Sequence, residues 1–262
     1  MDTNRRKLLK IGGLCALGIG ALPVVNAFGK SDLPKVTDNR QALVAKRWAM
    51  VIDLGKCWEK GKPGCMDCVL ACHVTHNVPD IGNRKEEIKW IWTETYNHVF
   101  PNPVNPTLPT ALAEKPVMVL CNHCKNASCV RVCPTKATFK RPNGITMMDY
   151  HRCIGCRFCM AACPYGARSF NLCEPRPFIK TELNPTFPTR EAGVVEKCNF
   201  CEERLATGLQ PACVEACAKE AKAMAFGDFE DPNSEVRQIL AQHQSIRRRP
   251  ELGLEPSVFY LV

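Results

Sequence analysis

Residues 153–164 read "CIGCRFCMAACP", in which four cysteines stand at C-x2-C-x2-C-x3-C spacing and a proline follows the last one. Two residues between successive cysteines keep the first three thiols on one tight loop. The fourth cysteine ends a helix-like stretch, "CMAAC". This pattern is typical of [4Fe–4S] ligation, in which three thiolates hold three irons of one cubane and the fourth reaches a neighbouring cluster.

Three further groups of four cysteines give the chain a fourfold internal repeat. Together the four groups use all but two of the 18 cysteines among 262 residues. Sixteen thiolates at such spacing predict four [4Fe–4S] clusters. The quartets are, in chain order, Cys57, Cys65, Cys68 and Cys72; Cys121, Cys124, Cys129 and Cys133; Cys153, Cys156, Cys159 and Cys163; and Cys198, Cys201, Cys213 and Cys217.

Other uses of so many cysteines fit the spacing less well. Disulfide bonds suit exported proteins, but repeated groups of close thiols would make poor staples. Tetrahedral zinc sites use C-x2-C pairs and do not need a third close cysteine. No C-x-x-C-H segment occurs, which argues against covalently attached haem.

The first quartet departs from the pattern, because the segment "WEKGKPG" separates Cys57 from Cys65. Its glycines and proline let the chain fold back, so that both sulfurs can reach one cluster. Two other thiols compete for this place. Cys15 lies near the N-terminus, and Cys173 lies in "NLCEP", where a buried, unligated cysteine is the ordinary interpretation. We therefore expect Cys57 to be the ligand.

The formal charge of +9 suggests an anionic partner such as nucleic acid or a membrane surface. Residues 1–27 hold +3 of this charge, which leaves +6 for the rest of the chain. Four clusters at about 2− each would change that remainder to about −2. We therefore interpret the basic residues as compensation for cluster charge, and predict no nucleic-acid partner.

Residues 1–27 are predicted to be a transport signal. Their apolar run, 11–25, is short for a membrane span and typical of a signal segment. The basic start "NRRKLLK" contains Arg5 and Arg6 and resembles a twin-arginine signal. Export after folding suits a protein whose metal ligands come together only in the folded state. We expect a periplasmic protein, with the signal either cleaved after Ala27 or kept as an anchor; an ordinary amphipathic helix is the alternative.

The rest of the chain predicts an α+β fold of short strands and helices wrapped around the clusters. Apolar runs at 50–52, 117–120 and 145–148 precede the first three quartets and indicate strands. Asn143-Gly144 is a hairpin-turn signal. The organisation we expect is a linker over 28–45, a four-cluster domain over 46–230 with Pro-rich insertions at 99–110 and 174–189, and a C-terminal helix and tail over 231–262, the helix having Asp231 as its N-cap and Pro232 in its first turn.

Several motifs resemble one protein family over nearly the whole chain after the signal. They are the C-x2-C-x11-C-x3-C spacing of the last quartet, "FGDFEDPNSEV" (226–236), "CHVTHNVP" (72–79) and "IKWIW" (88–92). The chain resembles the four-cluster ferredoxin subunits of membrane redox complexes, related to the iron–sulfur subunits of dimethyl-sulfoxide and polysulfide reductases. Within that family it is most similar to the periplasmic ferredoxins of membrane complexes associated with dissimilatory sulfite reductase.

The resemblance implies duplicated bacterial-ferredoxin-like domains, in which quartets 1 and 4 form one pair and quartets 2 and 3 the other. In keeping with this pairing, only the second and third quartets end in Cys-Pro. A crossed ligand scheme is also implied. Its four ligand sets are Cys57, Cys65, Cys68 and Cys217 for cluster 1; Cys72, Cys198, Cys201 and Cys213 for cluster 2; Cys121, Cys124, Cys129 and Cys163 for cluster 3; and Cys133, Cys153, Cys156 and Cys159 for cluster 4.

The resemblance further implies a periplasmic electron-transfer subunit that relays single electrons and has no catalytic residues of its own. Its partners would be an integral membrane quinone-interacting subunit and a periplasmic multihaem cytochrome c, in sulfite or sulfate respiration. Membrane association would depend mainly on these partners. Two alternatives stay open: the iron–sulfur subunit of a molybdopterin oxidoreductase acting on dimethyl sulfoxide, polysulfide or tetrathionate, and an iron–sulfur redox sensor or assembly factor.

Overall fold

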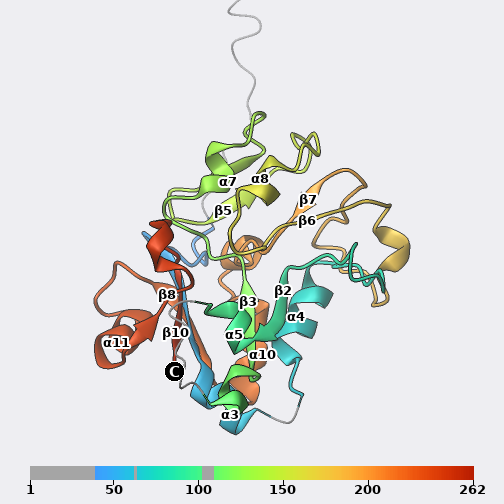
Figure 1. Cartoon of the computed structure of the whole chain (residues 1–262). Coiled ribbons are helices and arrows are strands. Elements are labelled where there is room, and N and C mark those ends of the chain that lie inside the picture. Colours follow the sequence, from blue (N-terminus) through green and yellow to red (C-terminus); the bar gives the residue numbers. More distant parts are fainter. Residues whose placement is uncertain (1–38, 62–63, 102–108) are drawn as a thin grey trace, which may run out of the picture. The chain divides into compact units, whose positions relative to one another are not determined.

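The computed structural model describes residues 39–61, 64–101 and 109–262 (Figure 1). The chain divides into two units, Met1–Arg40 and Gln41–Val262, and the following description concerns the second. The predicted transport signal and most of the 28–45 linker lie outside the described residues. In the described part of the chain, no helix is long and apolar enough to cross a membrane.

A four-stranded sheet joins the beginning of this unit to its end, in the order β8-β1-β10-β9. Strand β1 (Trp48–Asp53) pairs antiparallel with β8 (Met224–Asp228) and parallel with β10 (Val258–Leu261). Strand β9 (Ser245–Ile246) pairs antiparallel with β10. The segment after residue 230 therefore contributes a central strand as well as a helix.

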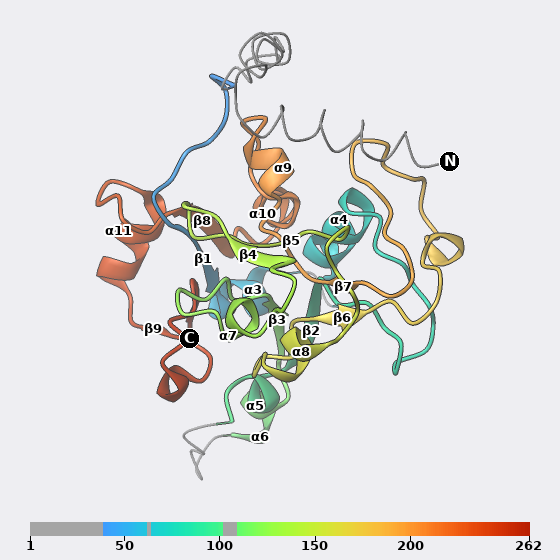
Figure 2. The same cartoon turned by 90° about the horizontal axis from the view of Figure 1, so that it is seen from above.

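Side chains along β1 alternate between two buried faces, as consecutive strand residues do. Trp48, Met50 and Ile52 belong to the main core, whereas Ala49 and Val51 lie in a smaller apolar cluster. Helix α11 (Glu235–Gln242) covers this second face, and Figure 2 shows it on the outer side of the sheet. The other face of the sheet is directed toward the cysteine-bearing elements.

Helix α11 begins later than the sequence indicated. Its N-cap is Ser234, whose hydroxyl oxygen accepts a hydrogen bond from the backbone N–H of Arg237 at 3.3 Å. The expected N-cap, Asp231, instead accepts a hydrogen bond from the backbone N–H of Asn233 at 2.9 Å. Asp231 thus closes a turn ahead of the helix, because a side chain bonded two residues on favours a turn over a helix start.

Three antiparallel strand pairs complete the sheet structure: β2 (Ile91–Thr95) with β3 (Pro116–Leu120), β4 (Thr138–Lys140) with β5 (Thr146–Met148), and β6 (Ser169–Phe170) with β7 (Val195–Glu196). The three apolar runs expected to be strands fall in β1, β3 and β5, which confirms that prediction. The expected hairpin is the β4–β5 pair, with Gly144 at φ +84° in its loop.

The helices are short, and most of them lie next to cysteines. Two contacts between helices distant in sequence organise the unit: α4 packs against α10, and α7 packs against α8 (Figure 1). This mixed architecture agrees with the expected α+β class. The helical segments are α3 (Leu54–Lys60), α4 (Asp67–Thr75), α5 (Tyr96–Val99), α6 (Thr110–Ala113), α7 (Ser128–Arg131), α8 (Phe158–Ala161), η1 (Arg176–Phe178), α9 (Glu202–Leu205), α10 (Ala212–Lys219) and η2 (Pro250–Leu252).

Candidate iron–sulfur sites

Four cysteines from three helices and a loop line one cavity: Cys57, Cys65, Cys68 and Cys217, here called the first set. Cys57 comes from α3 and Cys68 from α4, while Cys217 comes from α10, which packs against α4. Burial raises the pKa of Cys68 to about 12, and the other three thiols of the set raise it in the same direction. Cys57 therefore lies with the quartet that the sequence assigned to it.

The second set is Cys72, Cys198, Cys201 and Cys213, all of them buried. Burial raises the pKa of Cys72 well above its usual range, and the next causes are the thiols of the other three members. Cys213 lies one helical turn before Cys217 on α10, yet its neighbours are Cys201 and Cys198. One helix thus carries thiols of two different sets.

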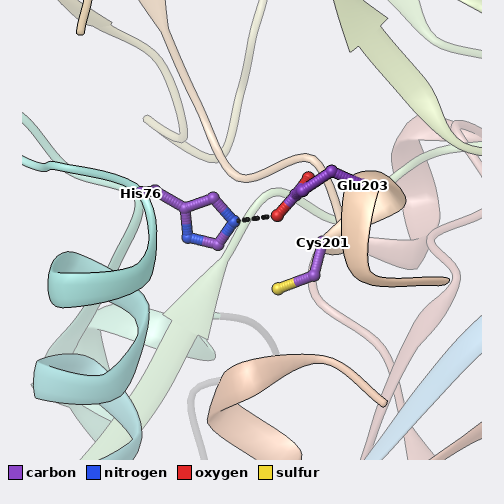
Figure 3. A group of neighbouring side chains, drawn as sticks. All are labelled: His76, Cys201 and Glu203. Atoms are coloured by element: carbon purple, nitrogen blue, oxygen red, sulfur yellow. Dashed lines mark hydrogen bonds and ion pairs between the residues drawn. The ribbon is translucent and has the colours of Figure 1, made fainter. Parts of the chain in front are cut away.

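A histidine and a glutamate support the second set (Figure 3). His76 is fully buried, and its ring stacks on Trp90 with centroids 4.5 Å apart. Its Nδ1 lies 2.9 Å from the carbonyl oxygen of Cys72, and its Nε2 lies 2.8 Å from Oε1 of Glu203. His76, Cys201 and Glu203 hold their ligand atoms within 4.8 Å of one another. Because Cys201 already belongs to a four-thiol set, we interpret the His76–Glu203 pair as a hydrogen-bonded support of that set.

The third set is Cys121, Cys124, Cys129 and Cys163. The pKa of Cys124 is raised to about 12, mainly by burial and then by the thiols of the other three members. Cys121 directly follows strand β3, Cys129 lies on α7, and Cys163 follows α8. The packing of α7 on α8 brings the last cysteine of the third quartet to the second quartet.

The fourth set, Cys133, Cys153, Cys156 and Cys159, is grouped as the resemblance implies, and the structure links two of its members, Cys153 and Cys159. Burial raises the pKa of Cys159, and Cys153 is among the thiols that add to this effect. Cys156 is exposed. The sulfur of Cys133 accepts a hydrogen bond from the backbone N–H of Thr138 at 3.4 Å. Although burial raises it, hydrogen bonds from Thr138 and Thr135 bring the pKa of Cys133 below its usual value.

The four sets are neighbours in the order first, second, third and fourth, and this succession is here called the line of sets. Three pairs of neighbouring thiols join successive sets: Cys68 with Cys72, Cys198 with Cys121, and Cys129 with Cys159. Burial changes along this line, because the inner sets are almost wholly buried and the outer sets are mostly half-buried or exposed. The arrangement has a protected middle and two accessible ends.

The chemistry around these thiols fits iron–sulfur clusters. The seventeen cysteines in the described part of the chain are all free thiols. Two buried cations, Lys197 and Arg168, lie beside them, and no carboxylate of the described residues forms an ion pair with either cation. Burying a charge without a counter-charge is costly. Anionic clusters held by the thiols would balance both cations.

Comparison with known proteins agrees with this chemistry. Residues 116–174 and 183–229 match the 4Fe-4S dicluster domain. The chain is 41% identical to iron–sulfur subunit 1 of the Hdr-like menaquinol oxidoreductase of Archaeoglobus fulgidus, over 98% of this chain and 97% of that protein. The chain belongs to the iron–sulfur subunits of multi-subunit oxidoreductases.

Two further relatives of this iron–sulfur subunit show the breadth of the family. A tetrathionate reductase subunit of Salmonella typhimurium is 34% identical, over 100% of this chain and 89% of that protein. The iron–sulfur cluster-binding subunit of menaquinone reductase of Nitratidesulfovibrio vulgaris is 36% identical, over 82% of this chain and 88% of that protein. These comparisons confirm the expected family and its electron-transfer role, and the sixteen grouped thiols fit four [4Fe–4S] clusters.

Sequence reasoning missed the buried groups that surround the thiols of the iron–sulfur subunit. His76 carried a signal, because it follows Cys72 by four residues, which places it at the C-cap of α4, one turn after that cysteine. Lys197 directly precedes Cys198, but this position in the sequence does not reveal that the lysine side chain is buried. Nothing in the sequence singled out Arg168. The cysteine expected to be unligated, Cys173, is half-buried in the loop after β6.

Proposed function

We propose that this iron–sulfur subunit relays single electrons in the periplasm between a quinone-interacting membrane subunit and a multihaem cytochrome c, in sulfite or sulfate respiration. The observation that carries the proposal is the line of four thiol sets, buried in its middle and accessible at both ends. A relay needs neighbouring redox centres and a surface at which electrons enter and leave. Two relatives named for menaquinol or menaquinone favour a quinone-linked partner.

In this proposal each of the four thiol sets holds one [4Fe–4S] cluster, which supplies one-electron redox chemistry when bound. The ligand sets are those of the crossed scheme. Two observations support it: the members of the first set line one cavity, and in the second and third sets the other three thiols raise the pKa of Cys72 and of Cys124. The protein's part is to space the clusters, exclude water from the inner two and set the surrounding charge.

The fourth set offers one end of the relay to a partner. Cys156 is exposed, and the apolar side chains of Ile154 and Phe158 beside it are 66% and 59% exposed. Exposed apolar side chains next to a redox centre suit close approach of another protein. The proposed periplasmic location comes from the twin-arginine segment, which lies outside the described residues.

A second candidate function is the electron relay of a molybdopterin oxidoreductase, which the likeness to the tetrathionate reductase subunit of Salmonella typhimurium favours. The two candidates differ in the partner at one end of the relay. Purification of the native complex from membranes, with its subunits identified by mass spectrometry, separates them. A multihaem cytochrome c supports the first candidate, and a molybdopterin-containing subunit supports the second.

Cluster content tests both candidates together. The purified subunit should contain about sixteen iron and sixteen acid-labile sulfide per chain, and four reducible cluster signals in EPR-monitored titration. These signals should survive repeated reduction and oxidation, whereas a redox sensor or assembly factor would have labile clusters. An iron content near four, or stoichiometric zinc, would contradict the relay.

A further inference from the structure

Arg168 occupies a buried position between two of the thiol sets. Its side chain is only 5% exposed, and it directly precedes strand β6. Nη1 donates a hydrogen bond to the hydroxyl oxygen of Thr138 at 3.2 Å. The backbone N–H of Thr138 in turn donates to the sulfur of Cys133, a member of the fourth set. Nη2 is buried and has no hydrogen-bond partner within the described residues.

The positive charge of Arg168 has no carboxylate partner in residues 39–61, 64–101 and 109–262. Another buried arginine, Arg190, shows the ordinary solution, because it forms an ion pair with Glu196 at 2.7 Å. An unpaired buried guanidinium is expensive, since it loses water without gaining a counter-charge. The counter-charge of Arg168 must therefore come from something other than an acidic side chain.

Cysteines of two sets lie where cluster-bound thiolates would supply that counter-charge. The strongest electrostatic partners of Arg168 are Cys129, Cys159 and Cys121. Cys129 and Cys121 belong to the third set, and Cys159 belongs to the fourth. The guanidinium is thus shared between the two sets.

We propose that Arg168 is an electrostatic bridge that favours the reduced state of both the third and the fourth cluster. The inference rests on the proposed ligand scheme. Reduction adds a negative charge to a cluster, and a fixed buried cation stabilises that charge. Because one guanidinium faces both sets, it raises both reduction potentials together and leaves the difference between them nearly unchanged. Arg168 acts through the cluster ligands and is a positioning residue.

The test is an EPR-monitored redox titration of Arg168→Met and Arg168→Lys in the full chain loaded with clusters. Signals are assigned beforehand with Cys124→Ser for the third cluster and Cys156→Ser for the fourth. In Arg168→Met we expect the equilibrium constant for one-electron reduction to fall at least tenfold at both clusters, which is about 59 mV per tenfold. The first and second clusters should keep their potentials. Arg168→Lys should shift the same two signals by less, because lysine keeps the charge but not the planar fork.

Arg152→Met is the matched control. Arg152 is next to Cys153 of the fourth set, but its side chain is 66% exposed and pairs with Asp149 at 3.2 Å. Solvent screens such a charge, so its removal should change the equilibrium constant for reduction of either cluster less than twofold. If Arg168→Met does not assemble its clusters, Arg168→Gln, a neutral and polar side chain, takes its place, and unchanged third and fourth signals in the neutral variant overturn the bridge. Equal shifts at all four clusters also overturn it. Iron content and the number of signals in the unmodified protein test the relay itself, so the two failures are distinguishable.

Discussion

Replacing Cys57 by alanine should convert the first cluster to a three-iron form rather than abolish it. Cys57 is the only member of the first set on α3, a helix that packs on β1 and β10. The other three members lie on or next to α4 and α10, which pack against each other without α3. Three thiols therefore stay in place. We expect iron to fall from about sixteen to about fifteen per chain, with about twelve as the value if the whole cluster is lost.

The assay is iron and sulfide analysis together with EPR of the oxidised protein, in which a three-iron cluster gives its own signal. Cys173→Ala is the matched control, because this half-buried thiol lies outside the four sets and should leave about sixteen iron. Sixteen iron and four unchanged cluster signals in Cys57→Ala would refute the assignment. Loss of iron in Cys173→Ala instead would show that Cys173 takes the fourth place.

Three more predictions concern the crossed ligands, the loop after α3 and the transport signal. Cys217→Ser should alter the signal of the first cluster and Cys213→Ser that of the second, although both lie on α10; loss of the same signal in both variants would contradict the crossed scheme. Gly61→Ala should reduce first-cluster occupancy by more than half, because the added methyl group would overlap the backbone carbonyl oxygen of Cys57. In the control variant Gly55→Ala the methyl group meets only ordinary contacts, so all clusters should be kept, and iron analysis compares the two variants. The double substitution Arg5→Lys and Arg6→Lys should retain the protein in the cytoplasm. Unchanged recovery from the periplasm in cell fractionation would rule out a twin-arginine signal.

The sequence by itself determined the features that depend on near neighbours in the chain. Three cysteines two residues apart share a loop whatever surrounds them, so the spacing of the third quartet was enough to predict its cluster chemistry. Apolar runs ahead of the quartets predicted β1, β3 and β5 for the same reason, since alternation and side-chain shape act over a few residues. The local rule failed at α11, where Asp231 and Ser234 both offer an N-cap and only the fold decides between them.

Only the tertiary structure decided which distant groups meet. Cys217 reaches the first set because α10 packs on α4, and Cys163 reaches the third because α8 packs on α7. The C-terminal segment became strand β10 because it pairs with β1, a contact that no local pattern encodes. The unpaired charge of Arg168 likewise appears only when burial and the missing carboxylate are seen together within the described residues. Burial, pairing and charge balance are sums over long-range contacts, and for that reason spacing along the chain could not predict them.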